Sequence, residues 1–135
     1  MKITSTKYSA DAFSFSTLVL RITLGMIMLG AHGCAKLLHF SKYSGRFADP
    51  FHIGSAASLS LDIFAEFFCS CLVILGLFTR LACIPLIIAM FVALWYAHHW
   101  DIFGMGERAG LFLGGYIALL FLGPGRLSID RLIGK

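Results

Sequence analysis

Two pairs of ionisable residues, each spaced by four positions, are the part of this sequence best suited to chemistry. His32 and Lys36 form one pair, and Asp62 and Glu66 form the other. Residues four apart share one face of an α-helix, so each pair predicts a polar stripe on an otherwise apolar helix. Residues of two antiparallel helices lie at equal depth when their numbers have a constant sum. Since 32 with 66 and 36 with 62 give the same sum, we expect His32 beside Glu66 and Lys36 beside Asp62.

Further polar residues fall at the same end of the expected helices. His98 ends the third apolar segment, and Glu107 and Arg108 begin the fourth. With Lys36 and Asp62, these residues predict a polar, ligand-binding cavity in the outer half of the protein. Intramembrane ionisable groups are functional-site candidates by default, but ion pairs that only brace the helices are an open alternative.

A metal site is not predicted. The four cysteines, Cys34, Cys69, Cys71 and Cys83, lie in apolar runs without a Cys-x-x-Cys spacing, and the histidines form no His-Glu-x-x-His motif. We therefore interpret the cysteines as small packing residues and predict no disulfide. A haem held between His32 and His98 is a weaker alternative.

The composition places these residues in a membrane. Hydrophobic residues make up 59% of the 135 residues, charged residues only 13%, and the mean hydropathy is +0.85. A soluble domain carries about 25% charged residues, so this chain cannot coat itself with polar groups. The same apolar content excludes a disordered or collagen-like chain.

Charged residues divide the chain into four apolar segments, and a bilayer-spanning helix needs about 20 such residues. The sequence predicts helices over about 16–39, 57–78, 81–100 and 107–123, the last ended by Gly123-Pro124-Gly125. The expected fold class is all-α: an integral membrane four-helix bundle, antiparallel and up-and-down, in a single domain over 1–135. A cleaved signal peptide is an alternative for the first segment.

The first two spans contain charge. Arg21 and Lys36, near opposite ends of the first span, are expected to extend their side chains toward the two interfaces. Asp62 and Glu66 enter the membrane with the second span, which is costly unless they face protein or water.

Basic residues predict the orientation. One side collects more of them, namely Lys2, Lys7, Arg21, Arg80, Arg126, Arg131 and Lys135, while the other has Lys36, Lys42, Arg46 and Arg108. By the positive-inside rule both termini are cytoplasmic. The basic balance is assigned to topology and anionic lipid, and no nucleic-acid partner is expected.

Two connecting features complete the prediction. The only long loop, 40–55, carries Phe47, Phe51 and Ile53, which indicate that it lies on the outer surface of the bundle. Ser128 is positioned to cap a short terminal helix.

The fourth segment carries small residues at strict four-residue spacing, Gly106, Gly110 and Gly114. Such a stripe lets another backbone approach closely. The neighbour is either a helix of the same chain or a second copy in a homo-oligomer, and the sequence leaves both open.

Several motifs in order resemble a known family. They are Leu20-Arg21, Leu24-Gly25, His32-Gly33, Lys36-Leu37, Glu66, the run from Gly76 to Leu81, and Leu122-Gly123-Pro124-Gly125-Arg126 with Ser128 and Asp130. Together they resemble the DoxX family of small bacterial inner-membrane proteins. The resemblance implies a four-helix protein of the inner membrane and a link to quinone-coupled oxidation of sulfur compounds or to thiol-stress complexes.

The sequence supports three functional hypotheses. In the first, the chain is the membrane subunit of a quinone-linked redox system, with His32 and Glu66 as the candidate catalytic, proton-exchanging residues. Lys36 or Arg108 would then donate a hydrogen bond to a carbonyl oxygen of the quinone. No flavin, haem or iron–sulfur motif is recognisable, so a membrane or periplasmic partner would carry the electrons. The second is a non-enzymatic membrane scaffold or assembly subunit, and the third is a small-solute transporter.

Overall fold

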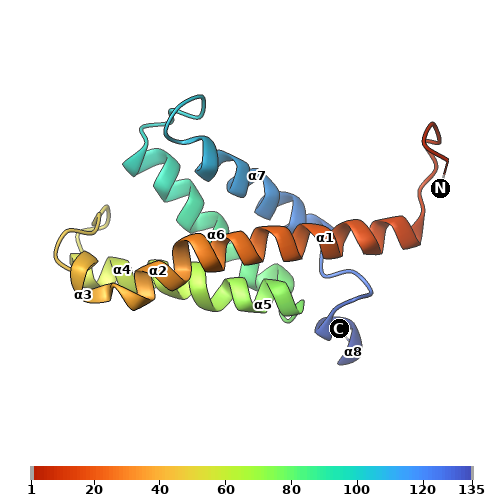
Figure 1. The fold of residues 1–135 in the computed structure, drawn as a ribbon, viewed down its shortest axis with the longest axis horizontal. Coiled ribbons are helices and arrows are strands. Elements are labelled where there is room, and N and C mark those ends of the chain that lie inside the picture. The colour runs from red at the N-terminus through yellow and green to blue at the C-terminus, as the bar shows by residue number, and fades with distance from the viewer. Residues whose placement is uncertain (1, 135) are drawn as a thin grey trace.

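The computed structural model describes residues 2–134, so Lys135, one of the basic residues counted for orientation, lies outside the described residues. Within that range every regular element is helical, and there is no strand (Figure 1). The elements in chain order are α1 (Ala10–Met28), η1 (Leu29–Gly33), α2 (Cys34–Leu38), α3 (Phe40–Tyr43), α4 (Ser55–Ile63), η2 (Phe64–Cys69), α5 (Ser70–Leu75), α6 (Thr79–Val92), η3 (Ala93–Ala97), α7 (Glu107–Leu122) and α8 (Ile129–Leu132). The η elements are π-helical turns inserted in longer helices.

Three continuous helices in the described range are long and apolar enough to cross a membrane. They run over Ala10–Leu38, Ser55–Leu75 and Thr79–Ala97. The fourth expected span corresponds to α7, whose 16 residues extend only about 24 Å, less than the hydrocarbon thickness of about 30 Å. The all-helical class and the membrane-spanning character are confirmed, whereas the four-helix membrane bundle is not.

Local chemistry explains where the helices begin and end. Ser9 accepts a hydrogen bond from the Ala12 N–H and starts α1, several residues before the expected first span. Gly76 adopts a left-handed conformation with φ 69° after α5, which lets the chain turn into α6. Gly123 ends α7, and Ser128 caps α8 through the Arg131 N–H, as the sequence predicts.

The helices pack as two pairs around one core. The segment α1 contacts α5, and α6 packs along α7, while α1 also contacts α7. Buried residues from these helices meet in a common cluster: Met28, Cys69, Val73, Cys83, Leu86, Phe112, Tyr116 and Leu119. In Figure 1 the two pairs diverge toward the end that carries α3 and the turn between α6 and α7. We call this the loop end, and the opposite end, with α8, the terminal end.

The glycines in and just before α7 differ in whether another part of the chain packs against them. A Cβ on Gly106 would meet the Leu94 side chain at 2.7 Å, whereas one on Gly114 would meet nothing within 4 Å. Gly115 faces α1, because its Cβ would lie 3.0 Å from Leu24. The close approach of α7 to α1 therefore uses Gly115, which the stripe did not include.

Candidate functional site

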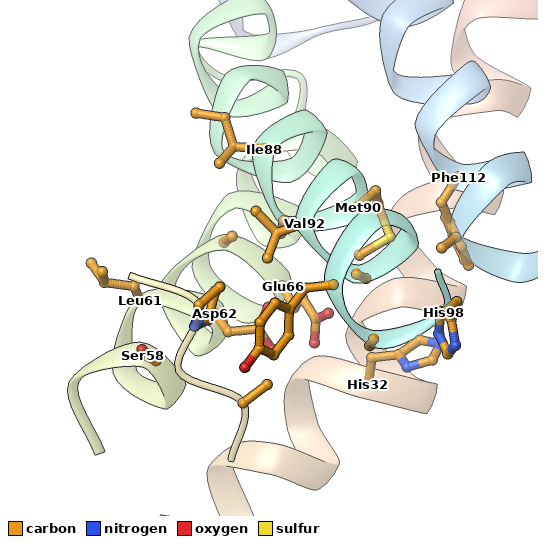
Figure 2. Close-up of a pocket in the computed structure, with 18 of the residues that line it drawn as sticks. His32, Ser58, Leu61, Asp62, Glu66, Ile88, Met90, Val92, His98 and Phe112 are labelled. Atoms are coloured by element: carbon orange, nitrogen blue, oxygen red, sulfur yellow. The ribbon is translucent and has the colours of Figure 1, made fainter. Parts of the chain in front are cut away.

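A cavity of about 960 Å³ occupies the loop end, between the diverging helix pairs (Figure 2). Every candidate site residue lines it: His32, Lys36, Asp62, Glu66, His98, Glu107 and Arg108. These residues come from η1, α2, α4, η2, α7 and the residue after η3. The volume lies at the upper end of the range of about 300–1,000 Å³ that is usual for small-molecule sites. The structure thus brings the predicted polar residues together around one space.

Lys36 is the centre of the polar cluster. Its Nζ donates to Glu66 Oε2 at 2.7 Å and also forms an ion pair with Asp62 Oδ2. Side-chain exposure is 24% for Lys36, 16% for Asp62 and 4% for Glu66, so the cluster reaches from the cavity into the protein. The expected contact between Lys36 and Asp62 is confirmed.

His32 and Glu66 line the same cavity, but no hydrogen bond or ion pair joins them in the described part of the chain. The His32 ring meets the edge of the Phe112 ring on α7, with the two ring centroids 6.0 Å apart, while Lys36 is the partner of Glu66. Glu66 is bonded by Lys36 and not by His32, because an ammonium carries three donors and bridges two carboxylates. His32 and His98 both line this cavity (Figure 2).

Three π-helical turns surround the cavity. The turn η1 contains His32, η2 contains Glu66, and η3 immediately precedes His98. A π-turn inserts an extra residue and disrupts the regular hydrogen bonding, and well under 1% of residues adopt it. Such turns are frequent at functional sites. Their occurrence in all three long helices beside one cavity indicates that the backbone is adapted to that cavity.

The polar faces meet because Gly33 lets two backbones touch. A Cβ on Gly33 would lie 2.6 Å from the Glu66 carbonyl oxygen and 2.8 Å from the Phe67 nitrogen. Neither atom could move aside to make room, because both belong to the backbone. The close contact of η1 with η2 sets the position of Lys36 relative to Glu66.

The long loop covers part of the cavity. Phe47, Phe51 and Ile53 line it, so the loop lies against the bundle, as the sequence predicts. The Phe47 ring centroid lies 5.5 Å from Lys36 Nζ, a cation–π distance. Phe51 and Ile53 remain 59% and 50% exposed, so the loop covers the cavity only in part.

Asp49 holds this loop against α4. Its carboxylate accepts hydrogen bonds from the N–H groups of Ile53 at 2.9 Å and Gly54 at 2.8 Å, and from the Ser58 hydroxyl at 2.9 Å. Desolvation raises the pKa of Asp49, but these bonds and the nearby His52 outweigh it and hold the pKa below its ordinary value. The carboxylate therefore acts in its ionised form, where it holds the end of the loop in place before α4.

The charge of the lining favours some ligands over others. Three carboxylates and two cations line the cavity, so its formal charge is negative when the histidines are neutral. A negative lining disfavours anions. In the described part of the chain, no group of three or more His, Cys, Asp or Glu side chains is placed to hold a metal ion.

A second polar cluster, at the terminal end, was missed by the sequence analysis. The Arg21 side chain is 2% exposed and donates four hydrogen bonds to carbonyl oxygens, those of Val73 (3.0 Å), Ile74 (3.0 Å), Pro124 (2.8 Å) and Leu127 (2.7 Å). Arg21 extends toward this end of the helices, but its guanidinium is buried among backbone carbonyls and does not reach solvent. The carbonyl groups at the end of α5 and in the 124–127 turn have no partner within a helix, and they bind the guanidinium in place of water.

Asp130 completes this terminal cluster. Its carboxylate accepts from the Phe78 N–H at 2.8 Å and the Thr79 N–H at 3.0 Å, and so caps the start of α6. Arg80 donates to the Leu120 carbonyl at 3.1 Å, near the end of α7. The sequence did carry one sign that Arg21 is buried: it is a charged residue in an apolar run, with no opposite charge four residues away. Its partners are backbone atoms, which a sequence does not display.

Comparison with known proteins agrees with this architecture. A family profile described as DoxX matches residues 16–99. The chain is 32% identical to an uncharacterized membrane protein of Mycobacterium tuberculosis over an alignment of 138 positions, which covers 89% of this chain and 82% of that protein. No solved structure matches the chain.

Proposed function

From the premise that the chain belongs to the DoxX family, we propose that it is the membrane subunit of a quinone-linked redox system and that the loop-end cavity holds the quinone head group. The single observation that carries this proposal is the cavity itself, a space of about 960 Å³ with apolar walls and the Lys36–Asp62–Glu66 cluster on one side. A mainly apolar site with a few convergent polar groups is typical of small-molecule binding.

The charge of the lining favours a neutral head group. Sulfur oxyanions would meet three carboxylates, whereas a quinone carries no charge and needs hydrogen-bond donors for its carbonyl oxygens. Lys36 gives two of its three donors to Glu66 and Asp62, and the third can bond a carbonyl oxygen. Arg108 is the second cationic donor of the lining.

Conversion of a quinone to its hydroquinone takes up two electrons and two protons. His32 and Glu66 line the cavity and are the groups that would exchange the protons, as catalytic residues. The electrons would come from a carrier on a membrane or periplasmic partner, which this function requires. The quinone supplies the redox chemistry, and this chain supplies its binding, orientation and protons.

The topology that suits this function has four spans. We propose that α7 crosses the bilayer beside α6, because it packs along that helix and buries Phe112, Tyr116 and Leu119 in the shared core. Local thinning of the bilayer accommodates a short span at modest cost. Both termini are then cytoplasmic and the cavity lies in the outer half of the bacterial inner membrane.

Purification from membranes in mild detergent tests the function. We expect quinone to co-extract with the wild type, and its amount to fall with Glu66→Gln and with His32→Ala. Lys42→Met, which removes an exposed lysine outside the cavity, is the matched control and is expected to retain quinone. If the wild type itself retains no quinone, and both cavity variants still assemble with their partner proteins, the redox proposal fails and the scaffold alternative is favoured.

A further inference from the structure

The wall of the cavity is open toward the hydrocarbon layer between two helices. Leu61 and Phe64, on α4 and η2, and Ile88, on α6, all line the cavity, yet they are 60%, 49% and 54% exposed. These three side chains form the rim of one opening, which we call the mouth; Phe51, Ile53 and Met105 also line the cavity and are 59%, 50% and 81% exposed, so the cavity has another opening at the loop end. Leu61, Phe64 and Ile88 are apolar and belong to helices long enough to span the membrane, so in a bilayer the opening that they form would face lipid.

The path of the helices produces the mouth. α6 packs against η2 and α5, whereas α4 contacts η2, α2 and α3. Beyond η2 the two helices therefore separate, and Figure 2 shows Leu61 and Ile88 on these two separate ribbons. Small side chains further in, Ala65 and Ala89, line the same cleft and leave room between the helices.

Polarity changes along this cleft. Its mouth is formed by the apolar residues Leu61, Phe64 and Ile88, and its inner side by the Lys36 ion pairs, in which the Glu66 side chain is 4% exposed. A molecule that satisfies both parts has a hydrogen-bonding head and a hydrocarbon tail. The negative formal charge of the lining disfavours phospholipid phosphates, so the head group it fits is neutral.

We propose that the ligand reaches the cavity from within the bilayer, through the mouth between α4–η2 and α6, and keeps a single long hydrocarbon tail in this mouth while its neutral head lies at Lys36. This inference rests on the proposed function and adds the route, the position of the tail and the contribution of the tail to affinity. Leu61, Phe64 and Ile88 are then specificity-determining residues, since each buried methylene of a tail adds to affinity.

The test compares two ligands in protein-containing nanodiscs, a benzoquinone without a tail and the same head group with a long polyisoprenoid tail. Ile88→Trp narrows the mouth at a half-exposed position, where added bulk need not disturb the core. We expect it to weaken binding of the long-tailed quinone about tenfold and to change binding of the tail-less one by less than about twofold. Leu61→Trp, on the opposite wall, should act in the same way. Ile117→Trp, an exposed position of α7 away from the cavity, is the matched control and should change neither affinity.

The outcomes separate this inference from the proposed function. Unchanged affinity for the long-tailed quinone in both mouth variants, with saturable binding of both ligands to the wild type, would contradict the placement of the tail in the mouth and leave the proposed function standing. An equal loss for both ligands would also contradict it, because the tail would then have no separate site. Absence of saturable binding to the wild type would refute both. As a second measurement, a photoreactive group at the tail end should label residues 61–68 or 84–92, and labelling of 47–53 instead would place the tail in the loop and overturn the inference.

Discussion

Two basic residues of the same long helix show how differently charge can be accommodated in a membrane protein. Lys36 neutralises Asp62 and Glu66 beside a cavity, whereas Arg21 donates to four backbone carbonyls at the terminal end. The planar guanidinium, with five donors, suits several carbonyls at once, and the compact ammonium suits two carboxylates. We infer that Arg21 is a structural residue and that Lys36 belongs to the functional site.

The structural role of Arg21 predicts a large loss of stability on a conservative substitution. Arg21→Lys keeps the charge but leaves buried carbonyls without donors, which should lower the free energy of unfolding by about 3 kcal/mol. Thermal unfolding in detergent measures it. Arg126→Lys is the matched control: Arg126 pairs only with the exposed Asp11, so the change should cost less than about 1 kcal/mol. Equal melting temperatures for the two variants would argue against the role of Arg21.

At the scale of helices, the features that depend on composition and residue spacing could be predicted from the sequence. It predicted the helical class, the contact between Lys36 and Asp62, and the end of α7 at Gly123. It could not predict the π-turns, because η1 and η2 have no pattern that differs from an α-helix, and tertiary contacts select them. The bridging role of Lys36 and the backbone partners of Arg21 were missed for the same reason.

The contact between η1 and η2 predicts opposite effects for two neighbouring glycines. Gly33→Ala places a Cβ 2.6 Å from the Glu66 carbonyl oxygen and should lower the free energy of unfolding by about 1–3 kcal/mol. Gly30→Ala meets nothing within 4 Å and should be neutral or stabilise by up to about 1 kcal/mol. Thermal unfolding of both variants in the same detergent checks the pair. A Gly33→Ala protein as stable as the wild type would show that η1 and η2 are not held in contact.

The loop held by Asp49 should respond to acid. Because the pKa of Asp49 is lower in the folded protein than its unfolded value of about 3.9, its stabilising effect is complete above that value and is lost as the pH falls through the folded pKa. Hydrogen exchange at the Ile53 and Gly54 amides should therefore lose protection in this acidic range. Asp49→Asn cannot titrate and should abolish this pH dependence, and its persistence in that variant would assign it to another group.

At the scale of the whole molecule, the protein has two ends with different tasks. The terminal end is closed by Arg21, Arg80 and Asp130, which bind backbone groups at helix ends. The loop end is open because the helix pairs diverge there, and it holds the cavity. Because the hydrogen bonds at the terminal end hold the helices together, the helices can stay apart at the loop end without loss of the fold. A binding site between helices needs this arrangement.

The proposed four-span topology makes a prediction for reporter fusions. A reporter active only in the periplasm should be active when inserted at Gly104, between α6 and α7, and silent when fused after Ile133. A reporter active only in the cytoplasm should give the opposite pattern and serves as the control. Activity of the periplasmic reporter at both positions would show that α7 does not cross the membrane, and activity only after Ile133 would invert the orientation.

The most direct test of the central claim, that the loop-end cavity binds a neutral quinone head group at Lys36, is equilibrium binding of a tail-less quinone to the protein in nanodiscs. We expect saturable binding with one site per chain, weakened at least about tenfold by Lys36→Met, which removes the donor, and unchanged by Lys42→Met. Circular dichroism should show that both variants keep the helical content of the wild type. Binding by a folded Lys36→Met protein with the affinity of the wild type, or binding that never saturates, would contradict the claim.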